Sequence, residues 1–170
     1  LKEIIDPADK NITLFGAGGA ARAIAVELAL SGATTISIVN RSRERAEVVV
    51  DLLNENTETT AIYHPWTDKY YIGPNTDIVI NATNIGLYPN VNEQLKIDFE
   101  SIMAHMVVAD CIPNPPQTHF LQTALAKGCK TINGLRMLIN QGVIGIKYWT
   151  GIDVDPDIMH DELKRVLNIK

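Results

Sequence analysis

A glycine cluster near the start of the chain could bind a phosphorylated ligand. Gly16, Gly18 and Ala21 fit the pattern GxGxxA, between an apolar run and a helix-like run. In this pattern the first glycine permits a tight turn, the second lets the backbone approach a pyrophosphate, and the small third residue lets helix and strand pack closely. The N–H groups at the start of the helix would attract phosphate. The pattern predicts dinucleotide binding, although any tight strand-to-helix turn can also need glycine.

About twenty residues further on, the sequence indicates which dinucleotide. NAD-binding versions of this pattern carry an acid that accepts hydrogen bonds from the adenosine ribose. Here Asn40, Arg41, Ser42 and Arg45 occupy that region. A carboxylate would repel a 2′-phosphate, whereas a guanidinium can form paired, charge-assisted hydrogen bonds with it. The pattern therefore predicts NADP as the cofactor.

An ordinary alternative is that Arg41 and Arg45 belong to a solvated helix start. Glu44 and Glu47 lie nearby, and exposed ion pairs of this kind contribute little stability. If Arg41 instead binds the 2′-phosphate, Arg41→Ala should weaken NADP(H) binding by about 1–3 kcal/mol. Binding of NAD(H) should then remain almost unchanged, and equal losses for both cofactors would contradict the hypothesis.

The elements that must position these residues alternate regularly along the chain. Short β-branched runs predict strands, and amphipathic or capped stretches predict helices. Such alternation requires parallel pairing with right-handed crossovers. We therefore expect one dinucleotide-binding α/β domain over residues 1–170, a doubly wound, Rossmann-like parallel sheet of about six strands with helices on both faces. The predicted strands are 12–15, 35–39, 60–63, 77–81, 107–110 and 130–132, and the predicted helices are 19–31, 43–54, 117–127, 135–150 and 156–167.

Single residues predict some details of these elements. Ser31 and Gly32 should end the first helix, and Asp155 should cap the last one ahead of a proline at its first position. Trp66 and Trp149 are interpreted as packing anchors rather than ligand platforms. For Trp149 the reason is that it lies at the end of a helix with an apolar face.

Composition narrows the class of protein. With 170 residues, 46% of them hydrophobic, the chain is long enough for one domain with a substantial core. A net charge of −5 offers no long-range attraction for nucleic acid or an anionic membrane. Two cysteines cannot form a disulfide framework or a metal cage, and the four histidines lack metal-ligand spacing. We expect a cytoplasmic protein without a metal, a nucleic-acid partner or a membrane partner.

Three further stretches carry a family resemblance. They are INATNIGLYPN (80–90), ADCIPNPPQTHFL (109–121) and GCKTINGLRMLINQGVIGIKYWTG (128–151). The first two follow predicted strands at the sheet edge where open α/β folds bind ligands. Together with GAGGAARA and NRSRERA, they resemble the C-terminal, cofactor-binding domain of the shikimate and quinate dehydrogenase family over nearly the whole chain.

The resemblance implies a set of binding residues. Matched positions are Gly16, Ala17, Gly18, Gly19 and Ala20 for the diphosphate; Asn40, Arg41, Ser42 and Arg45 for the adenosine phosphate; Ala82, Thr83 and Asn84 beneath the nicotinamide riboside; Cys111 and Gly134 beside the nicotinamide ring; and Gln141 for a substrate hydroxyl. Two positions depart from the family pattern. Pro113 replaces a common tyrosine that touches the substrate, and Asn84 stands where serine or proline is usual. The choice between shikimate and quinate therefore stays open.

The resemblance also implies a reaction that this chain does not complete. The family reduces 3-dehydroshikimate with NADPH to shikimate, in aromatic amino acid biosynthesis. Its general acid/base lysine and partner aspartate belong to an N-terminal substrate domain with motifs such as NxTxPxK, which this chain lacks. We expect no catalytic residue in this chain, and binding of NADP without turnover, because the proton donor is missing.

Other functions fit part of the same pattern. A quinate/shikimate dehydrogenase with relaxed cofactor or substrate choice would share all these motifs. A non-catalytic NADP-binding module would explain the glycine turn and the arginines, but has no need for Gln141. The NADPH domain of glutamyl-tRNA reductase has a similar glycine turn, but would not explain stretch 128–151.

Overall fold

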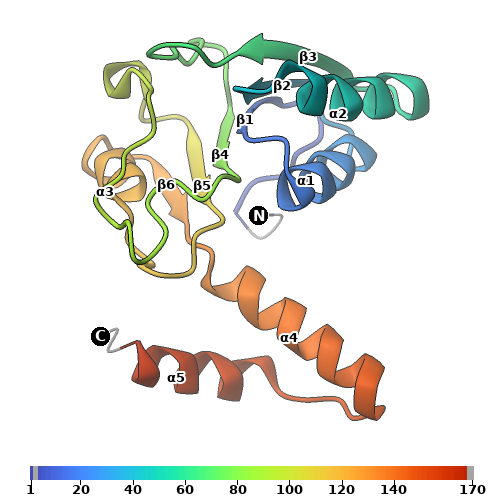
Figure 1. The fold of residues 1–170 in the computed structure, drawn as a ribbon, viewed down its shortest axis with the longest axis vertical. Helices are drawn as coiled ribbons and strands as arrows, with labels where there is room; N and C mark the ends of the chain where they lie inside the picture. The colour runs from blue at the N-terminus through green and yellow to red at the C-terminus, as the bar shows by residue number, and fades with distance from the viewer. Residues whose placement is uncertain (2–3, 168–170) are drawn as a thin grey trace.

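The computed structural model describes residue 1 and residues 4–167. Six parallel strands form one sheet in the order β3-β2-β1-β4-β5-β6, and helices lie on both sides of it (Figure 1), as expected. The strands are β1 (Asn11–Phe15), β2 (Thr35–Asn40), β3 (Thr60–Pro65), β4 (Ile78–Asn81), β5 (Val107–Asp110) and β6 (Lys130–Ile132). The helices are α1 (Gly19–Leu30), α2 (Arg43–Asn56), the short 3₁₀ helix η1 (Phe99–Ser101), α3 (His119–Ala126), α4 (Leu135–Thr150) and α5 (Pro156–Val166).

The strand order contains one reversal of direction. From β1 the chain builds outward through β2 to β3, and then returns to place β4 on the other side of β1. Open α/β sheets bind ligands outside the carboxyl ends of the strands at such a reversal. In this chain those ends are Phe15 and Asn81, each followed directly by predicted site residues.

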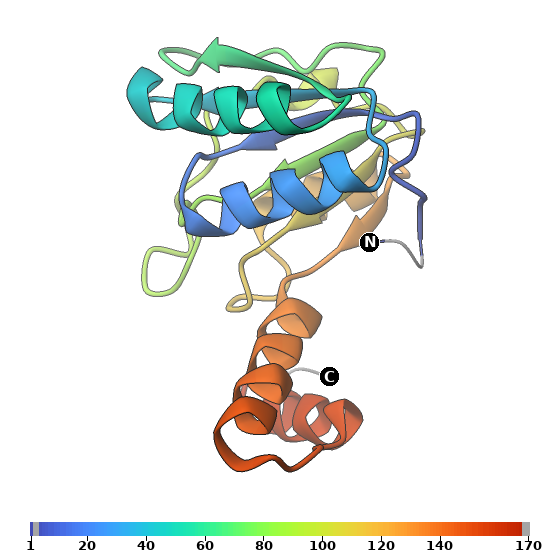
Figure 2. The same ribbon diagram turned by 90° about the vertical axis from the view of Figure 1, so that its right-hand side faces the viewer.

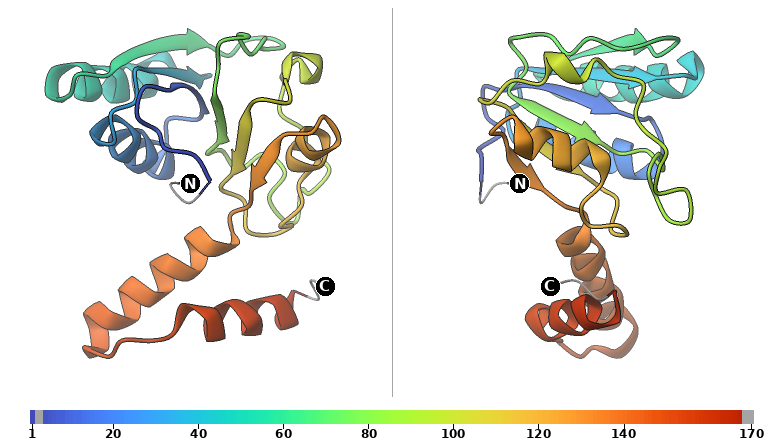
Figure 3. Two further views of the ribbon diagram at one scale, coloured as in Figure 1. Left: turned by 180° about the vertical axis from the view of Figure 1, so that it is seen from behind. Right: turned by 90° about the vertical axis from the view of Figure 1, so that its left-hand side faces the viewer.

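Two hydrophobic clusters fill the two faces of the sheet. Successive strand residues point to opposite faces, so Ile78 and Ile80 join one cluster and Val79 joins the other. The first cluster packs under α1 and α2, and the second under α3. Figure 3 shows α3 on the opposite side of the sheet from α1 and α2. We call residues 11–132, which contain both clusters, the sheet body.

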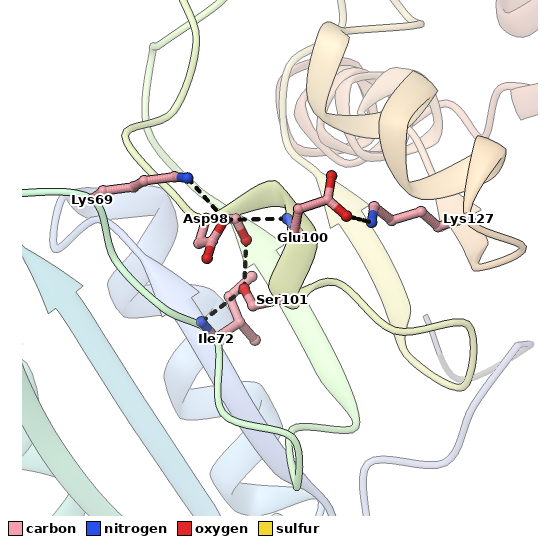
Figure 4. Close-up of polar contacts among 6 residues, drawn as sticks. All are labelled: Lys69, Ile72, Asp98, Glu100, Ser101 and Lys127. Carbon is pink, nitrogen blue, oxygen red and sulfur yellow. Dashed lines mark hydrogen bonds and ion pairs between the residues drawn. The ribbon is translucent and has the colours of Figure 1, made fainter.

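The connection between β3 and β4 has no helix. Residues 66–77 instead cross the α3 side of the sheet and are held by polar contacts (Figure 4). The buried backbone N–H of Ile72 donates to the Ser101 hydroxyl over 3.0 Å, and the Lys69 ammonium pairs with Asp98 at 2.9 Å. The ion pair is partly exposed and adds little stability, whereas the buried amide would cost more if left unpaired.

Helices α4 and α5 project from the sheet body (Figures 1 and 2). From β6 the chain enters α4, and α5 folds back beside it. We call residues 135–166 the arm. Its only buried side chains are Leu135 and Ile139, both in the first turns of α4. With 16 residues, α4 is the longest described helix, and none of the described helices is long and apolar enough to cross a membrane.

The two tryptophans differ from each other. Trp66 is a packing anchor as predicted, with 7% of its surface exposed and its ring 5.1 Å from that of Phe15. The prediction for Trp149 was wrong, because it is 85% exposed at the end of α4. The apolar face of that helix extends beyond the sheet body, and no described residue covers Trp149.

The predicted helix ends are confirmed. Ser31 ends α1, and Gly32 follows with a positive φ of 86°. At the start of α5 the Asp155 carboxylate accepts a hydrogen bond from the Asp157 N–H at 2.8 Å, and Pro156 occupies the first turn.

Candidate functional site

The turn between β1 and α1 requires glycine at its first position. Gly16 has a φ of 109°, which side-chain-bearing residues rarely adopt. A Cβ at this position would also lie 2.8 Å from the carbonyl oxygen of Ala82. The turn therefore lies directly against the segment that follows β4, and two groups of predicted site residues meet there.

The same turn is open where a phosphate would bind. A Cβ on Gly18 or Gly19 would have no heavy atom within 4 Å. Gly18 provides no side-chain cap for α1, and the first turn of that helix contains no acid. By contrast, side chains of Ser42, Thr118 and Asp155 cap α2, α3 and α5. The start of α1 thus offers N–H groups and open space, which fits a diphosphate.

The end of β2 is held in shape by its own side chains. Asn40 donates from Nδ2 to the carbonyl oxygen of Ser42 over 2.8 Å. The Ser42 hydroxyl accepts the Arg45 N–H at 3.4 Å and so caps α2. These contacts fix the backbone on both sides of Arg41.

The arginines near this turn have different partners. Arg43 pairs with Glu47 at 2.6 Å, one helical turn further on. The ion pairs found among residues 1 and 4–167 do not include Arg41 or Arg45, and both side chains are exposed. Arg43 is therefore engaged by Glu47, whereas the exposure of Arg41 and Arg45 agrees both with a solvated helix start and with an anion-binding role.

A cavity of about 260 Å³ opens beside Arg41. Its wall includes Trp66, whose indole N–H donates to the carbonyl oxygen of Lys96 at 2.9 Å. Ile85 adds a second apolar surface, and the lining cations Arg41 and Lys96 outnumber the one lining acid, Glu93. The cavity can therefore accept a flat, partly apolar group that carries negative charge nearby.

Residues from three loops meet above the α1 face of the sheet. Ala17, Ala82 and Cys111 all pack against the cluster beneath α1 and α2. The backbone N–H of Ala82 donates to the carbonyl oxygen of Phe15, and that of Cys111 to Asn81, both at 2.9 Å. The sheet ladder thus continues one residue beyond β4 and β5, and brings these predicted positions together.

The side chain of Thr83 turns inward. Its hydroxyl donates to Asn81 Oδ1 at 2.7 Å and accepts the Ile85 N–H at 3.2 Å. The neighbouring Asn84 is exposed at the start of the following loop. Of these predicted residues, Thr83 therefore shapes the loop, while Asn84 faces the outside.

The start of α4 touches the end of β5. A Cβ on Gly134 would lie 2.5 Å from the carbonyl oxygen of Cys111, so only glycine fits there. Burial, and to a lesser extent the nearby Asp110, raises the pKa of the Cys111 thiol to about 11. The thiol is therefore protonated at neutral pH, and Cys111 acts as a small packing residue rather than a nucleophile.

Gln141 stands apart from the other predicted site residues. It is exposed on α4, about 9 Å along the helix axis from Leu135. A Cβ on the next residue, Gly142, would meet Met159 of α5 at 2.9 Å. The structure therefore places Gln141 on the arm, beside the α4–α5 contact, and not among the loops at the sheet edge.

Three buried polar residues of this region were missed by the sequence reasoning. Asn81 and Asp110 end β4 and β5, and Thr118 caps α3; each is less than 5% exposed. For Asn81 and Asp110 the signal was a polar residue at the end of an apolar run, IVIN and VVAD. The described part of the chain holds no group of three or more His, Cys, Asp or Glu residues that could bind a metal.

The chain matches two family models. Residues 1–117 match the model of shikimate/quinate 5-dehydrogenase. Residues 134–164 match the model of the shikimate 5′-dehydrogenase C-terminal domain. The two matched ranges together include all the predicted binding residues.

Individual relatives agree with these matches. The NADP(+) shikimate dehydrogenase of Desulforamulus reducens is 42% identical over 163 residues, which are 94% of this chain and 56% of that protein. Ligand-free 5-ketofructose reductase of Gluconobacter sp. strain CHM43 is 49% identical with a TM-score of 0.88, over 97% of this chain and 59% of that one. Shikimate 5-dehydrogenase from Listeria monocytogenes, solved with shikimate and NAD, is 30% identical with a TM-score of 0.80, over 98% and 58%.

The chain therefore spans less than two thirds of the length of these relatives. Within that span, the six-stranded parallel sheet and the glycine turn accompany a family match over residues 1–117 of 170. This chain belongs to the shikimate/quinate 5-dehydrogenase family.

Proposed function

We propose that this chain is the NADP-binding domain of a shikimate dehydrogenase. Such an enzyme reversibly reduces 3-dehydroshikimate to shikimate while NADPH is oxidised to NADP. The observation that carries the proposal is the uncapped start of α1 at Gly18, with open space where a side chain would lie. Arg41 and Arg45 add two cations at the end of β2. The Desulforamulus reducens relative is named a shikimate dehydrogenase (NADP(+)), which supports the same cofactor.

Each part of the cofactor has a matching surface in the proposal. The N–H groups at the start of α1 bind the diphosphate, and Arg41 with Arg45 binds the 2′-phosphate. The cavity beside Arg41 accepts the adenosine end. Ala82, Thr83 and Cys111, with Gly134 behind Cys111, line the nicotinamide end. When bound, the nicotinamide gives or accepts the hydride.

The proton transfer is assigned to a further domain. Hydride transfer to a ketone needs an acid beside the carbonyl oxygen. At the sheet edge the buried Asp110 carboxylate accepts three hydrogen bonds, and the pKa of the Cys111 thiol is raised to about 11. The relatives are longer than this chain, and Ile144, Tyr148 and Trp149 on the arm are more than half exposed. We propose that the further domain covers these apolar side chains, supplies the acid and brings the substrate to Gln141.

A second candidate concerns the substrate. The 49% identity to 5-ketofructose reductase favours reduction of an open-chain or cyclic ketose by the same cofactor domain. Pro113, which replaces a substrate-contacting tyrosine of the family, is compatible with a substrate other than shikimate. Activity is measured with shikimate, quinate and 5-ketofructose, using this chain and any longer product of its gene. NADPH oxidation with 5-ketofructose but no NADP reduction with shikimate would reject the shikimate assignment.

A paired titration tests the cofactor assignment. We expect the chain to bind NADPH more tightly than NADH, and Arg41→Ala to weaken NADPH binding by about 1–3 kcal/mol with little effect on NADH. Arg43→Ala is the matched control, because it removes the same charge two residues away, where Glu47 already pairs with it. Equal losses of NADPH and NADH binding in Arg41→Ala would contradict the assignment, as would an equal effect of Arg43→Ala.

A turnover assay tests whether the proton donor lies in another domain. We expect the 170-residue chain to bind NADPH without reducing any of the substrates. Shikimate oxidation by the pure chain would contradict the assignment of the proton transfer to another domain.

A further inference from the structure

Two buried polar side chains meet at the ends of β4 and β5. Asn81 and Asp110 are register partners on adjacent parallel strands, with 1% and 3% of their surfaces exposed. In-register residues of parallel strands point to the same face of the sheet. Two residues earlier, Val79 and Val108 belong to the cluster under α3. The polar pair therefore borders that cluster at the carboxyl ends of the two strands.

The Asp110 carboxylate accepts three hydrogen bonds. Its Oδ1 accepts from Asn81 Nδ2 at 3.0 Å and from the Ile112 N–H at 3.1 Å. Its Oδ2 accepts from the Thr118 hydroxyl at 2.6 Å. Burial raises the pKa of the Asp110 carboxyl, and these hydrogen bonds partly offset that effect.

The partners of Asp110 extend the network to three segments. Asn81 Oδ1 accepts from the backbone N–H of Thr83 at 3.0 Å and from its hydroxyl at 2.7 Å. The Thr118 hydroxyl accepts the Leu121 N–H at 3.3 Å and so caps α3. Asp110 therefore joins the loop after β4, the loop after β5 and the start of α3.

The network is complete, and this completeness makes it sensitive to change. Among the described residues, no buried side-chain nitrogen or oxygen lacks a hydrogen-bond partner. A carboxylate can accept on both oxygens, whereas an amide at the same place would present an NH₂ group to one of the three donors. Such a mismatch leaves a buried donor unpaired or moves the segment that carries it.

We propose that Asp110 is a positioning residue for the nicotinamide end of the cofactor site. It holds the loop of Thr83 and the loop of Cys111 and Ile112 at a fixed separation, although it contacts no cofactor itself. This inference rests on the proposed function, because it assumes that these two loops flank the nicotinamide. The adenosine end, at Arg41 and the cavity beside it, lies outside the network.

The test compares a whole cofactor with its adenosine half. The chain and Asp110→Asn are titrated with NADPH and with adenosine 2′,5′-bisphosphate, which has the 2′-phosphate but no nicotinamide. We expect Asp110→Asn to weaken NADPH binding about tenfold, the effect of one charge-assisted hydrogen bond, and adenosine 2′,5′-bisphosphate binding less than about twofold. Equal weakening of both ligands, or no weakening of NADPH, would overturn the proposal.

A second pair of variants covers the case in which Asp110→Asn does not fold. Thr118→Val removes the donor to Asp110 Oδ2 in a side chain of similar shape, and Thr118→Ser keeps that donor. We expect Thr118→Val to weaken the binding of NADPH but not that of adenosine 2′,5′-bisphosphate. Thr118→Ser should bind NADPH as the unaltered chain does. Equal behaviour of the two variants would overturn the proposal. If the unaltered chain binds neither ligand, the proposed function itself fails, which is a distinguishable result.

Discussion

The sheet body and the arm differ in how far each completes its own core. In the sheet body both faces of the sheet are filled, and side chains such as Phe15, Ile36 and Leu121 are almost entirely buried. In the arm only two side chains of α4 are buried and none of α5. The sheet body therefore satisfies its own packing, whereas the arm presents apolar surface typical of an interaction site.

Glycine substitutions on α4 and at its start should give the largest contrast. In Gly134→Ala the new Cβ would lie 2.5 Å from the Cys111 carbonyl oxygen. A backbone atom, unlike the end of a flexible side chain, cannot move away by a rotamer change. We expect a loss of about 3 kcal/mol in the free energy of unfolding, measured with urea. The control is Gly145→Ala within the arm, where the nearest atom would be 3.8 Å away. It should stabilise the chain by up to about 1 kcal/mol, because alanine favours helix. Equal effects of the two changes would remove the contrast.

Matched isoleucine truncations should give a contrast of comparable size. Ile36 in β2 is fully buried, while Ile144 in α4 is 57% exposed. We expect Ile36→Ala to cost about 2–5 kcal/mol of unfolding free energy, and Ile144→Ala less than about 1 kcal/mol. The measurement is urea unfolding of both variants under one condition. Similar losses would mean that the arm is packed as tightly as the sheet body.

The two tryptophans provide the test with the smallest expected effect on stability, because each region contains one. Trp149→Phe leaves Trp66, which is 7% exposed, and Trp66→Phe leaves Trp149, which is 85% exposed. We expect iodide to quench the fluorescence of the Trp149 reporter strongly and that of the Trp66 reporter weakly. Equal quenching would contradict the difference in packing. Protection of Trp149 by a longer product of the gene would support the proposed covering domain.

The fold was predictable because its signals are local. The glycine turn and the alternation of β-branched and amphipathic runs are read within short windows, and the bounds of β5, β6 and α4 were predicted without error. The pairing of Arg43 with Glu47 also had a local signal, the i,i+4 spacing on a helix. Arg41 and Arg45 have no glutamate four residues further on.

The remaining features depend on contacts between distant parts of the chain. Asn81 and Asp110 meet only because β4 and β5 pair in one register, although 29 residues separate them. An apolar helix face is the same pattern whether its own chain or another one covers it, so the exposure of Trp149 could not be inferred. Whether the predicted cofactor residues bind NADP stays a prediction for the titrations.

The contact between Gly134 and the Cys111 carbonyl has a consequence for how such proteins diversify. Main-chain atoms stand on the Cys111 side, so substitutions of the surrounding side chains leave the contact in place. The direction in which α4 leaves the sheet is thus fixed relative to the end of β5. Residues on the arm can therefore vary while the main-chain geometry at the end of β5 stays the same.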